Sequence, residues 1–74
     1  MITAAEVVAL ITEHNLAPDV DAVGVDTLFD DMGIDSLNRA TLFLEVEVAF
    51  GKKLPPEDEA KYQTVNQLVA FLNG

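Results

Sequence analysis

Segments of this chain with apolar side chains at helical spacing constrain its fold most, because each of them begins beside a residue that can cap a helix. We expect helices over residues 4–15 and 36–50 and a last helix that starts at residue 65. A short helical turn is expected over 57–61, because two prolines precede it and acids open it. No segment alternates like a strand. The pattern predicts an all-α fold, a small four-helix bundle with three main helices and one short helix.

Capping boxes mark the start of the first and last helices. Thr3 stands three residues before Glu6, and Thr64 three residues before Gln67, the spacing at which the two side chains bond to each other's backbone. Gly51 supplies a stop after the middle helix. The side chains expected to face the core are Val7, Leu10 and Ile11 in the first helix, with His14 at the edge of that face, then Leu42, Phe43, Val46 and Phe50 in the second, and Val65, Leu68, Val69 and Leu72 in the last.

A long connection over residues 17–35 separates the first two expected helices. It holds Pro18, two glycines and six aspartates. Loops of this length in a compact domain are often functional. Its scattered apolar residues are expected to pin it across the helices, and they are Val20, Val23, Val25, Leu28 and Phe29.

The end of this loop, Asp31-Met32-Gly33-Ile34-Asp35-Ser36-Leu37, is the most informative stretch for function. Gly33 gives the backbone freedom just before the helix. Asp35 or Ser36 can cap the helix that follows, and Leu37 begins an apolar stripe along it. We therefore expect the Ser36 hydroxyl to be exposed at a positively polarised helix N-terminus.

Charge, length and cysteine content narrow the functions that are possible. Thirteen acids against four bases give a net charge of -9, which disfavours binding to nucleic acid or to an anionic membrane and favours basic partner surfaces. Seventy-four residues leave little room for a deep catalytic pocket, so we do not expect an enzyme. Because the chain has no cysteine, any thiol chemistry must come from a cofactor.

Individual residues offer little catalytic or metal-binding chemistry. We expect His14 to be a partly buried packing residue and not a base or a ligand. Asp19, Asp21 and Gly24 match the first, third and sixth positions of a calcium loop, but Val23 and Asp30 break the pattern at the fifth and twelfth. No dedicated metal site is therefore expected.

The N-terminus lacks the basic region of a signal peptide, and no apolar run approaches the ~20 residues that span a membrane. We expect a complete cytoplasmic protein, a single domain over residues 1–74, that is a monomer.

The 31–37 stretch resembles the phosphopantetheine attachment motif of acyl carrier proteins. The similarity continues through Glu47, Phe50, Leu54-Pro55, Glu57 and Thr64-Val65. The expected helix order and lengths also agree with that family over nearly the whole chain. The length is that of a free-standing carrier.

The resemblance implies a specific chemistry. A phosphopantetheinyl transferase would move 4′-phosphopantetheine from coenzyme A onto Ser36, and the terminal thiol of this arm would hold acyl groups as thioesters. Asp35 would help to position the magnesium ion during the transfer. Leu37 would pack under the arm or touch a partner. The further partners would be acyl-loading enzymes, ketosynthases and other acyl-processing enzymes of fatty-acid, polyketide or related specialised biosynthesis.

The expected second helix departs from the usual pattern of fatty-acid carriers, whose exposed face is rich in acids. Here Glu45 and Glu47 are its only carboxylates, and Arg39 adds a positive charge. We predict that partners are recognised more by apolar contact and by acids in the long loop. The predicted partner-binding residues are Leu37, Ala40, Thr41, Leu44, Glu47 and Val48.

Two alternatives stay open from the sequence. An aminoacyl or peptidyl carrier would use the same attachment chemistry, although Asp before Ser is more typical of acyl carriers. An unmodified acidic helical interaction module would use Ser36 only as a helix cap. In either case the apolar residues allow a small cavity between the helices.

Overall fold

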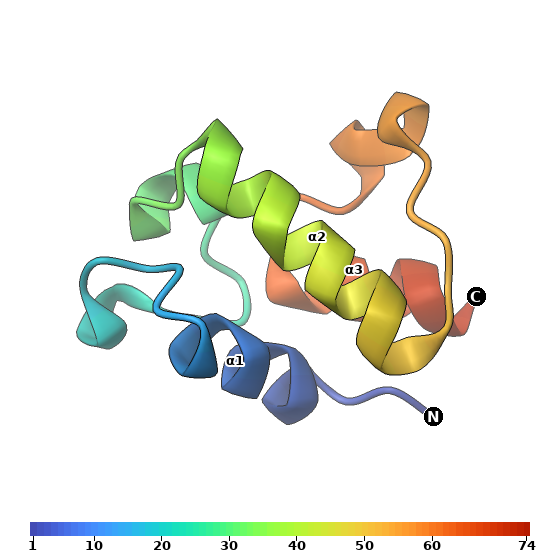
Figure 1. Ribbon diagram of the computed structural model, residues 1–74, viewed down its shortest axis with the longest axis horizontal. Helices are drawn as coiled ribbons and strands as arrows, with labels where there is room; N and C mark the ends of the chain where they lie inside the picture. Colours follow the sequence, from blue (N-terminus) through green and yellow to red (C-terminus); the bar gives the residue numbers. More distant parts are fainter.

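The chain folds into α-helices and shorter 3₁₀ helices around one apolar core, as the computed structural model in Figure 1 shows. The structure describes the backbone of residues 1–74 and every side chain except that of Val20, so the expected anchoring by Val20 lies outside the described residues. No strand occurs in this described backbone. The predicted all-α bundle is confirmed, and its elements are α1 (Ala4–Glu13), α2 (Ser36–Phe50), the short η3 (Pro56–Lys61) and α3 (Val65–Asn73).

Helix α1 begins with the predicted capping box. Thr3 Oγ1 accepts a hydrogen bond from the Glu6 N–H at 3.3 Å, and Glu6 Oε1 accepts one from the Thr3 N–H at 3.1 Å. The helix ends at Glu13, earlier than predicted. Asn15 adopts a left-handed φ of 53°, and the next N–H, that of Leu16, bonds back to the helix at Ile11 O over 3.0 Å. This C-terminal motif stops the helix before Pro18 can.

Helix α2 has the predicted bounds. Its first residue is Ser36, and it ends where Gly51 turns to a left-handed φ of 66° and donates its N–H to Glu47 O at 2.9 Å.

Thr64 caps helix α3, and its Oγ1 accepts a hydrogen bond from the Gln67 N–H at 3.1 Å. The other half of the predicted capping box is different, because Gln67 Oε1 bonds to the N–H of Gln63 at 2.9 Å and not to that of Thr64. The side chain of Gln67 thereby holds the connection between η3 and α3 at Gln63.

The core confirms most of the predicted inward face. Leu10, Phe43, Phe50 and Val69 are only partly buried and pack against it. His14 is exposed, with 39% of its side chain accessible, so the expectation of a partly buried packing residue is wrong. Its Nε2 lies 3.4 Å from Glu45 Oε2 of α2. The fully buried helical side chains are Val7 and Ile11 of α1, Leu42 and Val46 of α2, and Val65 and Leu68 of α3.

The long loop contains two 3₁₀ helices that its sequence did not predict, η1 (Val20–Ala22) and η2 (Phe29–Met32). Phe29 is buried and Val23 is partly buried, as expected, whereas the side chains of Val25 and Leu28 are exposed and do not pin the loop. The backbone fixes this part of the chain instead. The Phe29 N–H donates to Gln63 O at 3.0 Å, and Val25 O accepts from the Asn66 N–H at 2.9 Å.

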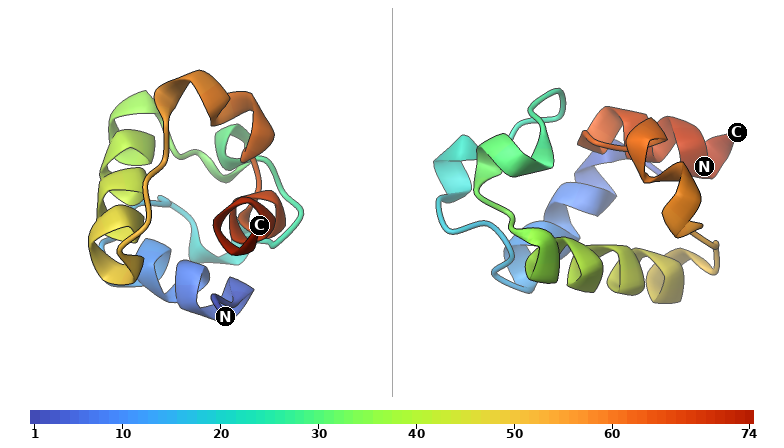
Figure 2. Two further views of the ribbon diagram at one scale, coloured as in Figure 1. Left: turned by 90° about the vertical axis from the view of Figure 1, so that its right-hand side faces the viewer. Right: turned by 90° about the horizontal axis from the view of Figure 1, so that it is seen from above.

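The views in Figure 2 show how the helices enclose the core. In the end-on view, α1 lies below, α2 and α3 stand on opposite sides, and η3 (orange) lies over the gap between α2 and α3. The two termini lie near each other, and Asn73 joins them by accepting from the Ile2 N–H at 3.0 Å and donating to Ile2 O at 2.8 Å. The start of α2 is therefore at the end of the molecule far from the termini (Figure 1).

Candidate functional site

The loop reaches Ser36 through a turn that only glycine fits well. Gly33 has a left-handed φ of 78°, and a Cβ at this position would lie 2.9 Å from Pro18 Cγ. The next residue, Ile34, is buried, and its N–H donates to Phe29 O at 3.1 Å. With Ile34 anchored in the core, Asp35 and Ser36 lie at the exposed junction between loop and helix.

Asp35 caps α2, so of the two residues predicted as possible caps, Asp35 and Ser36, it is Asp35 that has this role. Its Oδ1 accepts a 2.8 Å hydrogen bond from the Asn38 N–H. Asn38 in turn donates from Nδ2 to Leu16 O at 3.2 Å and so ties the start of α2 to the end of α1. Among the described residues, none forms a hydrogen bond with the hydroxyl of Ser36, which is exposed as predicted. The first-turn N–H groups and the helix dipole favour an anion at this point.

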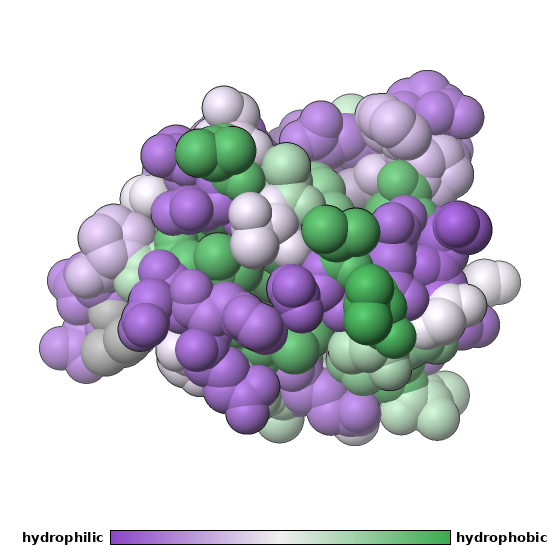
Figure 3. Space-filling model, viewed as in Figure 1, coloured by the Kyte–Doolittle hydropathy of each residue, from purple (hydrophilic) through white to green (hydrophobic). Residues whose placement is uncertain are grey.

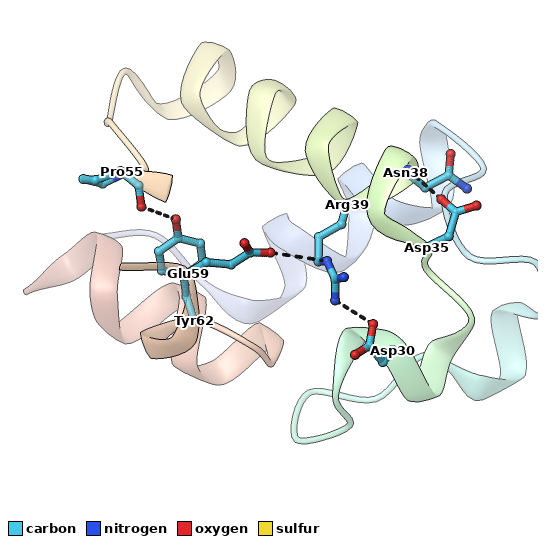
Figure 4. A network of polar contacts seen from close by, with 7 residues as sticks. All are labelled: Asp30, Asp35, Asn38, Arg39, Pro55, Glu59 and Tyr62. Carbon is cyan, nitrogen blue, oxygen red and sulfur yellow. Dashed lines mark hydrogen bonds and ion pairs between the residues drawn. The ribbon is translucent and has the colours of Figure 1, made fainter. Parts of the chain in front are cut away.

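Arg39, one turn beyond Ser36, joins three elements through ion pairs. Its Nη1 lies 2.7 Å from Asp30 Oδ1 of η2, and its Nε lies 3.5 Å from Glu59 Oε1 of η3. Figure 4 shows the guanidinium between these two carboxylates. Only 22% of the Arg39 side chain is exposed. The positive charge of Arg39 is therefore paired with two partly exposed carboxylates and contributes little to the outer face of α2.

Two hollows adjoin at this ion pair. The first, of about 350 Å³, opens beside Ser36 between α2 and η3, and its wall includes the apolar side chains of Phe43, Leu44 and Leu54. The second, of about 330 Å³, lies on the other side of the pair, against Leu28, Phe29 and Gln63. Arg39, Glu59 and Tyr62 line both of them. Both hollows are open at the surface, whereas the sequence allowed a small cavity between the helices.

Aromatic rings pack beside both hollows. The ring of Phe43 meets those of Phe29 and Tyr62 edge to face, with centroids 6.0 Å and 5.1 Å apart. The buried hydroxyl of Tyr62 donates to Pro55 O at 2.7 Å, as Figure 4 shows. Burial raises the pKa of Tyr62 above its ordinary value, and the negative charges of Glu59 and its neighbours raise this pKa further.

The outer face of α2 carries an exposed apolar stripe, visible as green side chains over α2 in Figure 3. Leu37 is 75% exposed, Leu44 58% and Val48 74%, and Ala40 between them is exposed as well. Leu37 is thus not a core residue. These four residues are called the apolar stripe below.

Thr41 and Glu47, the other predicted partner-binding residues, are half-buried and hold parts of the fold. The Thr41 hydroxyl donates to Leu37 O at 3.2 Å. Glu47 Oε2 accepts a 2.7 Å hydrogen bond from the Leu54 N–H, which secures the connection between α2 and η3.

The acidic residues do not assemble a metal centre in the part of the chain that the structure describes: no group of three or more His, Asp or Glu side chains lies close enough to hold an ion. Asp19, the first residue of the calcium-like pattern, uses Oδ1 to accept from the N–H of Asp21 at 3.0 Å. Among the described helices, none is long and apolar enough to cross a membrane.

The family model for the phosphopantetheine attachment site matches residues 3–72 of the 74 residues. The match covers α1, the long loop, α2, η3 and nearly all of α3, with the Ser36 junction inside it. Domains of this family receive 4′-phosphopantetheine covalently and act as carriers, not as catalysts.

Proposed function

Because this chain belongs to the phosphopantetheine attachment family, and is therefore a phosphopantetheine carrier, we propose that Ser36 is the residue that receives the arm. The observation that carries this proposal is that different residues cap α2 and present a hydroxyl at its start. Asp35 makes the capping hydrogen bond, and Ser36 presents an exposed hydroxyl beside it. The arm supplies a thiol, a group that the chain itself lacks, and this thiol holds acyl groups as thioesters.

The start of α2 fits a phosphodiester for electrostatic reasons. The hydroxyl oxygen of Ser36 bonds to the phosphorus that carries pantetheine, and its proton leaves. The bond from that phosphorus to the bridging oxygen of the pyrophosphate breaks, so the nucleotide part of coenzyme A departs with the bridging oxygen. The transferase supplies the catalysis for this step, so Ser36 needs no base of its own. The product places its negative charge at the N-terminus of α2, where backbone N–H groups and the helix dipole favour an anion.

We assign two roles to Asp35. Its carboxylate caps α2 through the Asn38 N–H, and the family resemblance gives it a second role, in positioning the magnesium ion while the transferase is bound. The carboxylate has a second oxygen that the capping bond does not need, so the two roles are compatible.

The apolar stripe is proposed as the surface that the transferase contacts. It begins at Leu37, next to the residue that the transferase must reach, and continues along the outer face of α2 to Val48. Arg39 is neutralised by Asp30 and Glu59, so α2 offers few free charges to a partner. Thr41 and Glu47 stand at the edge of this surface. Apolar contact beside a few loop acids is therefore the proposed mode of recognition.

The rate of arm transfer tests this surface. We expect Leu44→Asp and Val48→Asp each to lower the rate with transferase, magnesium and coenzyme A by about tenfold, because each places a charge in a desolvated contact. Ala9→Asp, at an exposed site on α1, is the matched control and should leave the rate unchanged. The wild-type rate should change little as the screening length falls from about 10 Å to about 3 Å with added salt. A strong salt dependence with normal rates for both stripe variants would contradict the proposal.

The proposed cargo is an acyl group of fatty-acid, polyketide or related specialised biosynthesis. Asp35 before Ser36 favours this class over the aminoacyl or peptidyl class, because acyl carriers more often have Asp at that position. Intact mass of the carrier isolated from its own cells tests the class. Acyl increments on the arm support the proposal, and aminoacyl increments would contradict it.

A further inference from the structure

Arg39 is the one basic side chain in the sequence of α2, and its ion pairs stand between the two hollows beside Ser36. It reaches Asp30 in the segment before α2 and Glu59 in the segment after it. Neither the attachment of the arm nor the apolar stripe uses this residue. The position of Arg39 between the two hollows therefore needs a separate explanation.

We propose that Arg39 determines which cargo this carrier can shelter. The Arg39–Glu59 pair divides the space beside Ser36, so short acyl chains are confined to the first hollow. A longer chain enters the second hollow only when this pair separates. The inference rests on the proposed attachment of the arm at Ser36.

The residues between the two hollows explain why the Arg39–Glu59 pair separates them. The acyl chain begins at the thiol end of the arm, and an arm on Ser36 that folds back along α2 brings it first to the apolar side chains of Phe43 and Leu54. To continue toward Phe29 it must pass the guanidinium of Arg39 and the carboxylate of Glu59, which line both hollows. An alkyl chain between these two groups would remove water from both charges and separate them, which is unfavourable. The pair is thus a barrier to long apolar cargo.

The contact with Glu59 is the weaker of the two and is the one expected to open. It spans 3.5 Å, against 2.7 Å for the contact with Asp30, and half of the Glu59 side chain is exposed. Exposed ion pairs contribute little to stability. Glu59 also lies on η3, a 3₁₀ helix in which none of the described residues is buried. Movement of η3 away from α2 would separate Glu59 from Arg39 while Arg39 stays bound to Asp30.

The experiment loads the apo protein through the transferase with a series of acyl groups from butyryl to hexadecanoyl, supplied as acyl-coenzyme A, and confirms each product by intact mass. Backbone hydrogen exchange is then measured at Phe29 by NMR. The Phe29 N–H donates to Gln63 O at 3.0 Å, and both residues line the second hollow. Cargo that enters this hollow should slow exchange at Phe29 by about tenfold.

In the wild type we expect this slowing only for the longest chains. In Arg39→Met and Glu59→Gln, exchange at Phe29 should already slow with shorter acyl chains. Glu59→Gln keeps the Arg39–Asp30 contact, so it tests the proposal even if Arg39→Met fails to fold. Lys52→Met is the matched control, because it removes a positive charge from an exposed site outside both hollows.

The same onset of slowing in the wild type, Glu59→Gln and Lys52→Met would overturn the role of Arg39. That result differs from failure of the proposed function, in which no acyl increment would be found on the wild type in the first place.

Discussion

The carboxylate of Asp35 accepts the Asn38 N–H at 2.8 Å, so the helix that begins at Ser36 is capped by the residue before it. This relationship leaves the Ser36 hydroxyl outside the capping interaction and available to a modifying enzyme. It also means that Asp35 and Ser36 can be altered separately, with different consequences for stability and for arm transfer.

Substitution of Asp35 should separate its two proposed roles. Asp35→Ala is expected to lower the free energy of unfolding by about 1 kcal/mol, because the Asn38 N–H loses its acceptor. Asp35→Asn should lose much less stability, because an amide oxygen also caps helices. Both variants should slow arm transfer if the carboxylate positions magnesium. Urea unfolding, monitored by circular dichroism, measures the stability of each variant. Intact mass measures its rate of arm transfer. Equal stability losses in both variants would contradict the capping role, and a normal transfer rate in Asp35→Asn would contradict the magnesium role.

Gly33 and Gly51 both have left-handed backbones but differ in their surroundings. A Cβ at Gly33 would lie 2.9 Å from Pro18 Cγ, whereas at Gly51 it would meet none of the described atoms within 4 Å. Gly51→Ala should therefore cost about 1 kcal/mol from backbone strain alone. Gly33→Ala should cost about 3 kcal/mol, because the clash with Pro18 adds to the strain. Thermal and urea unfolding of the two variants measure these losses, and equal values would show that the contact with Pro18 is relaxed.

The contribution of Tyr62 to the free energy of unfolding should fall at high pH. The pKa of Tyr62 is raised above its ordinary value of 10.0 in the folded state, first by burial and then by nearby acids. Above pH 10 the unfolded chain loses this proton while the folded chain keeps it, so rising pH favours unfolding; below pH 10 the stability is fully present. Because the chain has one tyrosine and no tryptophan, tyrosinate absorbance reports Tyr62 alone.

Tyr62→Phe is the control for that titration. It should remove the alkaline loss of stability associated with the hydroxyl and, at neutral pH, cost about 1 kcal/mol through the lost hydrogen bond to Pro55 O. A tyrosinate midpoint at or below the ordinary value in the folded wild type would contradict the burial of this hydroxyl.

Glu47 is expected to matter for stability more than its neighbour Glu45. Glu47→Ala removes the acceptor of the 2.7 Å bond from the Leu54 N–H and should cost about 2 kcal/mol, because a charged acceptor is lost from a partly buried site. Glu45→Ala removes only a surface contact with His14 and should cost less than about 0.5 kcal/mol. Urea unfolding measures both, and faster hydrogen exchange at Leu54 should accompany the Glu47 loss alone. Equal costs would show that the bond to Leu54 adds nothing to stability.

The parts of the fold that the sequence predicted are those that depend on local chemistry. Helix α2 has the predicted bounds because its cap and its stop, Asp35 and Gly51, lie next to the helix in the chain. The sequence predicts an end of α1 that is too late, because Asn15 adopts the left-handed conformation that glycine more often supplies. The 3₁₀ helices η1 and η2 are too short to show a periodic pattern.

The site could be predicted only where its residues adjoin in sequence. The 31–37 stretch located the exposed hydroxyl, and helical spacing indicated the apolar stripe. The partners of Arg39 could not be foreseen, because Asp30 and Glu59 come close to it only after the loop and η3 have packed against α2. The same holds for Glu47, predicted as a surface residue, whose bond to Leu54 depends on how the chain turns after Gly51.

The most direct test of the central claim is the position of the arm after transfer. Wild type and Ser36→Ala are incubated with a phosphopantetheinyl transferase, magnesium and coenzyme A, and the product is located by tandem mass spectrometry. We expect one phosphopantetheinyl increment on Ser36 of the wild type and none on Ser36→Ala, whose stability should stay within about 0.5 kcal/mol of the wild type because Asp35 still caps α2. An increment that persists in Ser36→Ala, or a folded wild type that takes none, would contradict the assignment of Ser36.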